Sequence, residues 1–116
     1  MPKFLKTKVS RLELLKVING ERKADIVLKN ANLVNVFTKE IIPSNLVIKG
    51  DRIAFIGNTD ISRMIGLSTQ VIDVKGQYLV PGLIDPHIHV ESSMLTLKQF
   101  AKAVLPLGTT TAVSYT

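Results

Sequence analysis

The segment after Pro81-Gly82 restricts the possible folds of this chain more than any other. Residues 83–90, "LIDPHIHV", form a nearly continuous apolar run with polar residues at alternate positions, which is typical of a strand. Thr96 and Gln99 then have the spacing of a helix N-terminal cap, and Pro106 and Gly108 end the helix. The apolar stripe of this helix comprises Leu97, Phe100, Ala101, Val104 and Leu105. A β-branched run, "TTTAVSY" (109–115), follows, so the pattern predicts a βαβ unit of a parallel sheet.

The preceding residues show a different, β-rich pattern. A short helix is predicted over 10–17, where Ser10 and Glu13 have capping-box spacing and Asn19-Gly20 ends it. Between residues 24 and 80, turn residues separate the runs "DIVLKN", "NLVNVF", "NLVIKG", "RIAFIG" and "QVIDVKGQYLV". Gly50-Asp51 and Lys75-Gly76 are interpreted as hairpin turns, and 60–65 as a helical turn. This pattern predicts a small antiparallel sheet or sandwich.

Composition excludes several classes of function. The 116 residues, 46% of them hydrophobic, suffice for one small domain with a real core. The net charge of +6 favours an acidic partner, but the chain has only four Phe, two Tyr and no Trp to stack on bases. A solvated basic face is therefore a better interpretation than nucleic-acid binding.

The absence of cysteine limits both the compartment and the type of metal site. Without cysteine there is no disulfide framework and no Cys-ligated zinc, so any metal must be bound by His and carboxylate groups. No apolar run approaches the roughly 20 residues of a membrane span. We therefore expect a cytoplasmic protein that does not bind membranes.

The only two histidines, His87 and His89, lie one residue apart at the end of the predicted strand. On a strand, residues two apart share a face, and two imidazoles there can converge on one divalent ion. Parallel α/β folds also place their active sites at the carboxyl ends of strands. The alternative is a pair of hydrogen-bonded histidines without a ligand, and it stays open because two ligands do not close a metal site. Asp85 falls on the same face by the same spacing.

These residues carry a family resemblance. "PGLIDPHIH" resembles the signature of the amidohydrolase superfamily, whose members combine a small β-sandwich with a metal-dependent (β/α)8 barrel. "HIHVESSMLTLKQFAKAVLPLGTTTAV", "LLKVINGERKADIVLKNANLVNVFTKEI" and "DVKGQYLVPGLID" resemble adenine deaminases, over residues 14–113. The resemblance implies an α/β fold with a β-rich N-terminal part. Its expected divisions are a helix and lead-in (1–22), a partial β-sandwich, or composite, segment (23–80), and the first βαβ unit of an incomplete barrel (81–116).

The resemblance also implies a reaction of purine salvage. Adenine would be hydrolysed to hypoxanthine and ammonia at a centre of manganese or iron, with His87 and His89 among its ligands. The bound ions would lower the pKa of water so that hydroxide attacks the purine carbon bearing the amino group. Glu91 would be a ligand, a substrate contact, a hydrogen-bonding support or a solvated side chain. Asp85 would orient a ligand or, with Pro86, simply shape the backbone.

Dihydroorotases and hydantoinase-type ring hydrolases resemble the same strand but usually carry H-x-H-x-R. Here that position is Glu91. A carboxylate at this position would repel a carboxylate substrate, which favours a neutral purine.

The sequence departs from the adenine deaminase pattern at its end, where Ser114, Tyr115 and Thr116 stand in place of D-P-H-E and several hundred further residues. Six barrel strands, the other metal ligands and the catalytic acid/base are lacking, so we expect no catalysis by the chain alone and assign it no catalytic residue. Two hypotheses remain. The chain is the N-terminal piece of an adenine deaminase that needs the missing part, or a non-catalytic remnant that associates with another chain such as a full-length paralogue.

Overall fold

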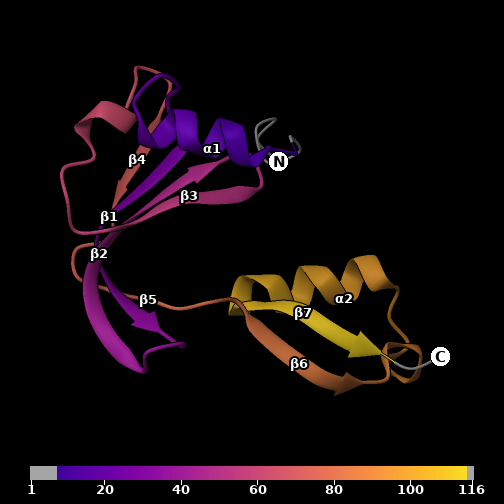
Figure 1. Cartoon of the computed structure of the whole chain (residues 1–116). Coiled ribbons are helices and arrows are strands. Elements are labelled where there is room, and N and C mark those ends of the chain that lie inside the picture. The colour runs from indigo at the N-terminus through magenta and orange to yellow at the C-terminus, as the bar shows by residue number, and fades with distance from the viewer. Residues whose placement is uncertain (1–7, 115–116) are drawn as a thin grey trace. The chain divides into compact units, whose positions relative to one another are not determined.

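A computed structural model of the chain describes residues 8–114 (Figure 1). The chain divides into two compact units between Val80 and Pro81. Tyr115, the end of the predicted last strand, lies outside the described residues. Within residues 8–114, no helix combines the length and apolar character needed to cross a bilayer.

The first unit begins with helix α1 (Arg11–Ile18), which confirms the predicted short helix. The Ser10 hydroxyl accepts a hydrogen bond from the Glu13 backbone N–H at 3.2 Å, as the capping spacing predicts. The helix ends at Asn19, and Gly20 follows with a φ of +83°. That left-handed conformation favours glycine, so the sequence fixes both ends of this helix locally.

One mixed sheet forms the body of the first unit. Strands β1 (Ile26–Asn35), β2 (Glu40–Lys49) and β3 (Arg52–Gly57) pair antiparallel, and the Gly50-Asp51 turn joins β2 to β3 as predicted. Strands β4 (Gln70–Asp73) and β5 (Tyr78–Leu79) both pair with β1, and both run parallel to it. The sheet order is β3-β2-β1-β4, with β5 further along the same edge of β1.

The predicted hairpin at Lys75-Gly76 is therefore wrong, and so is a purely antiparallel sheet. Both turn residues have positive φ, +53° and +77°, but the turn is attached to β1 itself. The Gly76 N–H donates to the Asn30 carbonyl at 2.7 Å, and the Asn32 amide donates to the Gly76 carbonyl at 2.6 Å. These bonds hold the chain against one edge of β1, so β5 resumes the direction of β4 instead of reversing it.

The two predicted runs "DIVLKN" and "NLVNVF" form one strand. Asn30 takes a left-handed φ of +59°, and the pairing of β1 with β2 shifts register between Leu28 and Ala31. The Asn45 side chain accepts the Asn30 N–H at 3.1 Å. The irregularity is thus a bulge inside a continuous strand, because a side chain of the partner strand satisfies the backbone group that leaves the ladder.

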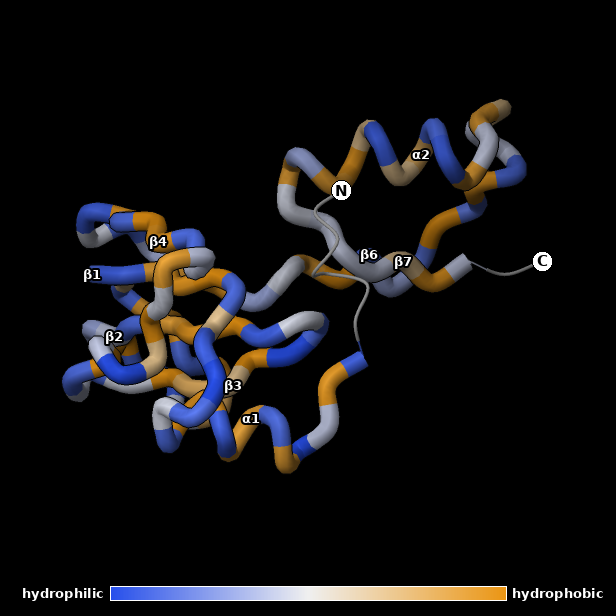
Figure 2. The backbone as a smooth tube through the Cα atoms, turned by 90° about the horizontal axis from the view of Figure 1, so that it is seen from above, coloured by the Kyte–Doolittle hydropathy of each residue, from blue (hydrophilic) through white to orange (hydrophobic). Residues whose placement is uncertain are grey.

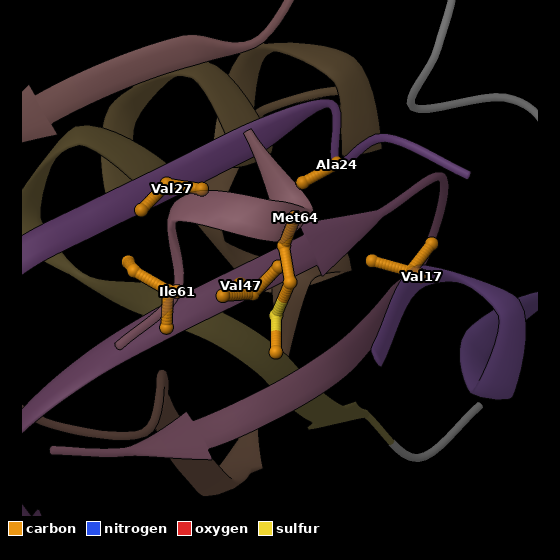
Figure 3. Packing of buried hydrophobic residues seen from close by; sticks show 6 residues of the cluster. All are labelled: Val17, Ala24, Val27, Val47, Ile61 and Met64. Atoms are coloured by element: carbon orange, nitrogen blue, oxygen red, sulfur yellow. The ribbon is translucent and has the colours of Figure 1, made fainter. Parts of the chain in front are cut away.

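The hydrophobic core of the first unit lies on one face of this sheet (Figure 3). Strand residues Val27 and Val47 are fully buried, and α1 adds Val17. A 3-10 turn, η2 (Ser62–Met64), lies within the predicted helical turn and brings in Met64, whose side chain runs beside Val47. The remaining members of the cluster are Ala24 and Ile61.

The second unit is the predicted βαβ arrangement. Strand β6 (Leu83–Ile88) pairs parallel with β7 (Thr109–Ser114), and helix α2 (Leu97–Val104) connects them through η4 (Leu105–Leu107). The Thr96 hydroxyl accepts the Gln99 N–H at 3.3 Å, which confirms the predicted cap. Along α2, apolar and polar residues alternate with the turns of the helix (Figure 2). Its apolar stripe and β7 line a groove of about 310 Å³.

Candidate functional site

His87 and His89 lie at the carboxyl end of β6, but only His87 is inside the strand. The predicted strand over 83–90 ends at Ile88, and His89 precedes a short 3-10 turn, η3 (Val90–Ser93). The Ser92 N–H donates to the His89 carbonyl at 3.1 Å and closes this turn. Val90 is buried within the turn, whereas both histidines are exposed.

The two imidazoles point their Nε2 atoms at each other. These nitrogens are 3.0 Å apart, and the ring planes meet at 74°. At this distance one imidazole donates an N–H to the other, which is the hydrogen-bonded pair that the sequence left open. The same two nitrogens are close enough together that both would bind one divalent ion once that proton is lost.

Glu91 contacts the opposite side of the second imidazole. Its Oε1 atom is 2.9 Å from Nδ1 of His89, with both side chains about half exposed. The pKa of Glu91 is lowered, first by a hydrogen bond from its own backbone N–H and then by the bond from His89. When Nδ1 of a neutral His89 donates to this carboxylate, its Nε2 carries the lone pair, which is the form that binds a metal.

The contact between Glu91 and His89 does not depend on the alternation of a strand. The alternation of a strand would have placed Glu91 on the histidine face, but Glu91 belongs to η3, where the chain is no longer extended. The turn, and not a continued strand, brings the carboxylate to the ring. Ser114 is the smallest of the causes that lower the pKa of this carboxylate.

Ser114 was not singled out from the sequence, and no local signal could have identified it. It lies 23 positions after Glu91, and only the pairing of Ile88 with Ser114 across the parallel strands brings it close.

Asp85 bonds to the backbone in front of the histidines. Its Oδ1 atom accepts the backbone N–H of His87 at 3.1 Å. The register of β6 with β7 is irregular between Asp85 and Ile88, where Pro86 has no N–H to contribute to the ladder. Of the two roles considered for Asp85, this contact corresponds to shaping the backbone.

The donors described here are too few to hold a metal ion by themselves. Among the described residues, no group of three or more His, Cys, Asp or Glu side chains is arranged to hold an ion. Two imidazole nitrogens at a chelating separation, with a carboxylate behind one of them, fit two positions of a divalent coordination sphere. Any further ligands would have to come from outside residues 8–114.

Comparison with curated proteins shows what the chain is related to. It is 54% identical over 98 residues to an adenine deaminase of Moorella thermoacetica, a match that covers 84% of this chain and 16% of that protein. It is 48% identical over 102 residues to an adenine deaminase of Dehalococcoides mccartyi, covering 88% and 17% respectively. The chain is a homologue of the N-terminal part of adenine deaminases. It spans about a sixth of the length of these relatives.

Solved structures agree with this family at the level of the fold. A prolidase crystallised with N-methylphosphonate-L-proline superposes with a TM-score of 0.60 at 23% identity, covering 77% of this chain and 25% of the prolidase. The L-hydantoinase (dihydropyrimidinase) of Arthrobacter aurescens gives 0.57 at 22% identity, covering 78% and 20%. Both have the amidohydrolase fold, so the adenine deaminase homologue has the start of that fold, with its β-rich composite segment. No protein-family model matches the chain.

Proposed function

We propose that this chain contributes the first βαβ unit, and two metal-binding histidines, to a centre that deaminates adenine hydrolytically to hypoxanthine and ammonia. The observation that carries the proposal is the 3.0 Å separation of the His87 and His89 Nε2 atoms at the carboxyl end of β6. Homology to adenine deaminases supports the choice of adenine as substrate. Glu91 in place of the arginine of dihydroorotases agrees with a neutral purine.

The residues of this chain would have defined tasks in that centre. His87 and His89 would hold a divalent ion, manganese or iron, through Nε2, and the backbone bond from Asp85 would fix the strand that carries them. When bound, such an ion acts as a Lewis acid and lowers the pKa of water. The acid/base groups of the reaction are assigned to parts of the barrel that this chain does not supply.

The apolar surfaces of both units support a requirement for further protein. In the sheet, Leu28, Leu46, Ile56 and Ile72 pair across neighbouring strands. Each adjoins a residue of the buried face and therefore points to the opposite face. Leu46 is buried and Leu28 half-buried, whereas Ile56 is 44% and Ile72 39% exposed, so the second half of this row is open to solvent. In the second unit, α2 has no buried residue and its apolar stripe lines the open groove. We therefore expect the isolated chain to be inactive.

A chimera tests the proposal. The full chain would be joined to the part of the Moorella thermoacetica adenine deaminase that follows the matched segment, and ammonia release from adenine measured with Mn²⁺. We expect activity from the chimera and none from the 116-residue chain alone. His87→Asn and His89→Asn should each abolish it, while Glu21→Gln, an exposed acidic control, should not. Full activity of both histidine variants would refute the assigned metal site, and ammonia release by the chain alone would refute its inactivity.

The same exposed surfaces favour a second candidate function, a non-catalytic module that associates with another chain. The groove of about 310 Å³ between α2 and β7 is lined mainly by aliphatic and aromatic side chains and by threonines. The partner would be the remaining barrel on a separate polypeptide, or a full-length paralogue. Co-elution with full-length Moorella thermoacetica adenine deaminase in size-exclusion chromatography is expected under this function, and independent elution would count against it.

The lack of cysteine supports our proposal of a cytoplasmic location.

A further inference from the structure

We infer that Glu91 is a positioning residue that fixes the ring orientation and tautomer of His89 for metal binding. The inference rests on the proposed function, because it assigns a role within the same two-histidine site. It goes beyond that function in separating the residue that orients a ligand from the ligands themselves.

The first step concerns which side of the ring Glu91 occupies. Its Oε1 atom lies 2.9 Å from Nδ1 of His89, while Nε2 of the same ring faces His87 at 3.0 Å. The two ring nitrogens point away from each other, so the oxygen that bonds Nδ1 cannot also bind an ion held at Nε2. Glu91 is therefore placed behind the ligand, as in carboxylate–histidine–metal arrangements.

The second step concerns what holds Glu91. A half-exposed glutamate on a turn would ordinarily sample several rotamers and contribute little to a neighbour. Here its Oε1 atom meets Nδ1 of His89 at 2.9 Å. Glu91 lies in η3, and the Ser92 N–H closes this turn on the His89 carbonyl at 3.1 Å. One short turn therefore carries both the ring and the carboxylate, which limits the positions that Glu91 can take.

The third step concerns the consequence for metal affinity. Donation by Nδ1 leaves the Nε2 lone pair available and makes the ring a stronger base. Loss of such an outer carboxylate costs typically about 10–100-fold in metal affinity. Because Glu91 is exposed, its replacement removes the hydrogen bond without opening a cavity in the fold.

The experiment titrates the 116-residue chain with Zn²⁺ at pH 7.5. Binding and tautomer are followed by NMR spectra that correlate the ring nitrogens and protons of the two histidines. In the wild type, His89 should carry its proton on Nδ1, and Zn²⁺ should shift the Nε2 signals of both histidines. Glu91→Ala should weaken Zn²⁺ binding by 10–100-fold and let the His89 proton exchange between the two nitrogens. Glu91→Gln keeps an acceptor oxygen but not the charge, so its Zn²⁺ affinity should lie between that of the wild type and that of Glu91→Ala.

Control variants separate the possible failures. Glu21→Ala removes an exposed carboxylate of the first unit and should change neither readout, while the backbone amide spectrum shows that each variant is folded. Unchanged Zn²⁺ affinity in Glu91→Ala, or a His89 proton on Nε2 in the wild type, would overturn the positioning role. If His87→Asn and His89→Asn leave Zn²⁺ binding intact, the proposed metal site itself fails. If they abolish binding while Glu91→Ala does not weaken it, only the present inference fails.

Discussion

Met64 offers the sharpest test of how the first unit is stabilised. Its side chain is 1% exposed and lies beside Val47 in the core, although it comes from the short turn η2 and not from a strand (Figure 3). Met64→Ala removes three heavy atoms, worth about 0.8 kcal/mol each in transfer free energy, or roughly 2.4 kcal/mol. A residual void of about 50 Å³ adds roughly 1.2 kcal/mol at about 24 cal/mol per Å³. The expected loss is therefore about 3–4 kcal/mol.

Such a loss is large for a unit of this size. A unit of about 70 residues is stable by roughly 4–10 kcal/mol, at 0.05–0.15 kcal/mol per residue. Urea unfolding followed by far-ultraviolet circular dichroism should show a midpoint lowered by roughly 1–3 M. Met64→Leu, which nearly conserves volume, should cost less than about 1.5 kcal/mol and provides a folded comparison.

Met94 supplies the matched control, because the same substitution there removes the same atoms from a side chain that is 96% exposed. Met94→Ala should leave the free energy of unfolding of the first unit within about 0.5 kcal/mol of the wild-type value. If Met64→Ala costs less than about 1 kcal/mol, or no more than Met94→Ala, then η2 does not close the core and the reasoning is refuted.

Two further predictions concern one strand pair and one titration. A Cβ on Gly82 would lie 2.8 Å from Cβ of Thr110 and closer still to its Oγ1 and Cγ2 atoms. Gly82→Ala should therefore separate β6 from β7 and remove cross-strand amide protection in hydrogen exchange, and adding Thr110→Ala should restore part of that protection. Full protection in Gly82→Ala would contradict this close approach. The pKa of Asp73 is lowered by the bond from the Lys75 backbone N–H and then by that from the Asn30 amide. Because the folded-state pKa lies below the unfolded value of about 3.9, the stabilisation is complete above that value and is lost as pH falls through the folded pKa. The difference in urea midpoint between wild type and Asp73→Asn should therefore be present at pH 6 and shrink towards pH 3, whereas a constant difference would show that the charge of Asp73 is not responsible.

The helices could be read from the sequence because their ends are set by neighbouring residues. Ser10 caps α1 and Thr96 caps α2 through bonds to backbone N–H groups three positions on. Gly20 and Gly108 follow the helical segments with positive φ. These interactions span only a few positions, so local patterns contain all the information that they require.

The sheet of the first unit could be predicted only in part. Local pattern predicts the Gly50-Asp51 hairpin, but it also predicts a break between strands at Asn30, where the Asn45 side chain produces a bulge. It predicts a hairpin at Lys75-Gly76, where bonds to Asn30 and Asn32 hold the chain to the edge of β1. In each case the deciding partner lies 15 or more positions away, where no local pattern records it.

The same division holds for the candidate site. The sequence by itself determined the chemical types and their order: two histidines separated by one residue at the end of a strand, a carboxylate two positions later, and the family to which the chain is related. Only the tertiary structure decided that β6 ends at Ile88, so that a turn brings Glu91 against Nδ1 of His89, and that parallel pairing places Ser114 beside Ile88. The physical reason is that residue type and spacing are covalent properties of the chain, whereas the end of a strand and the neighbour across it depend on hydrogen bonds with a strand more than twenty positions away.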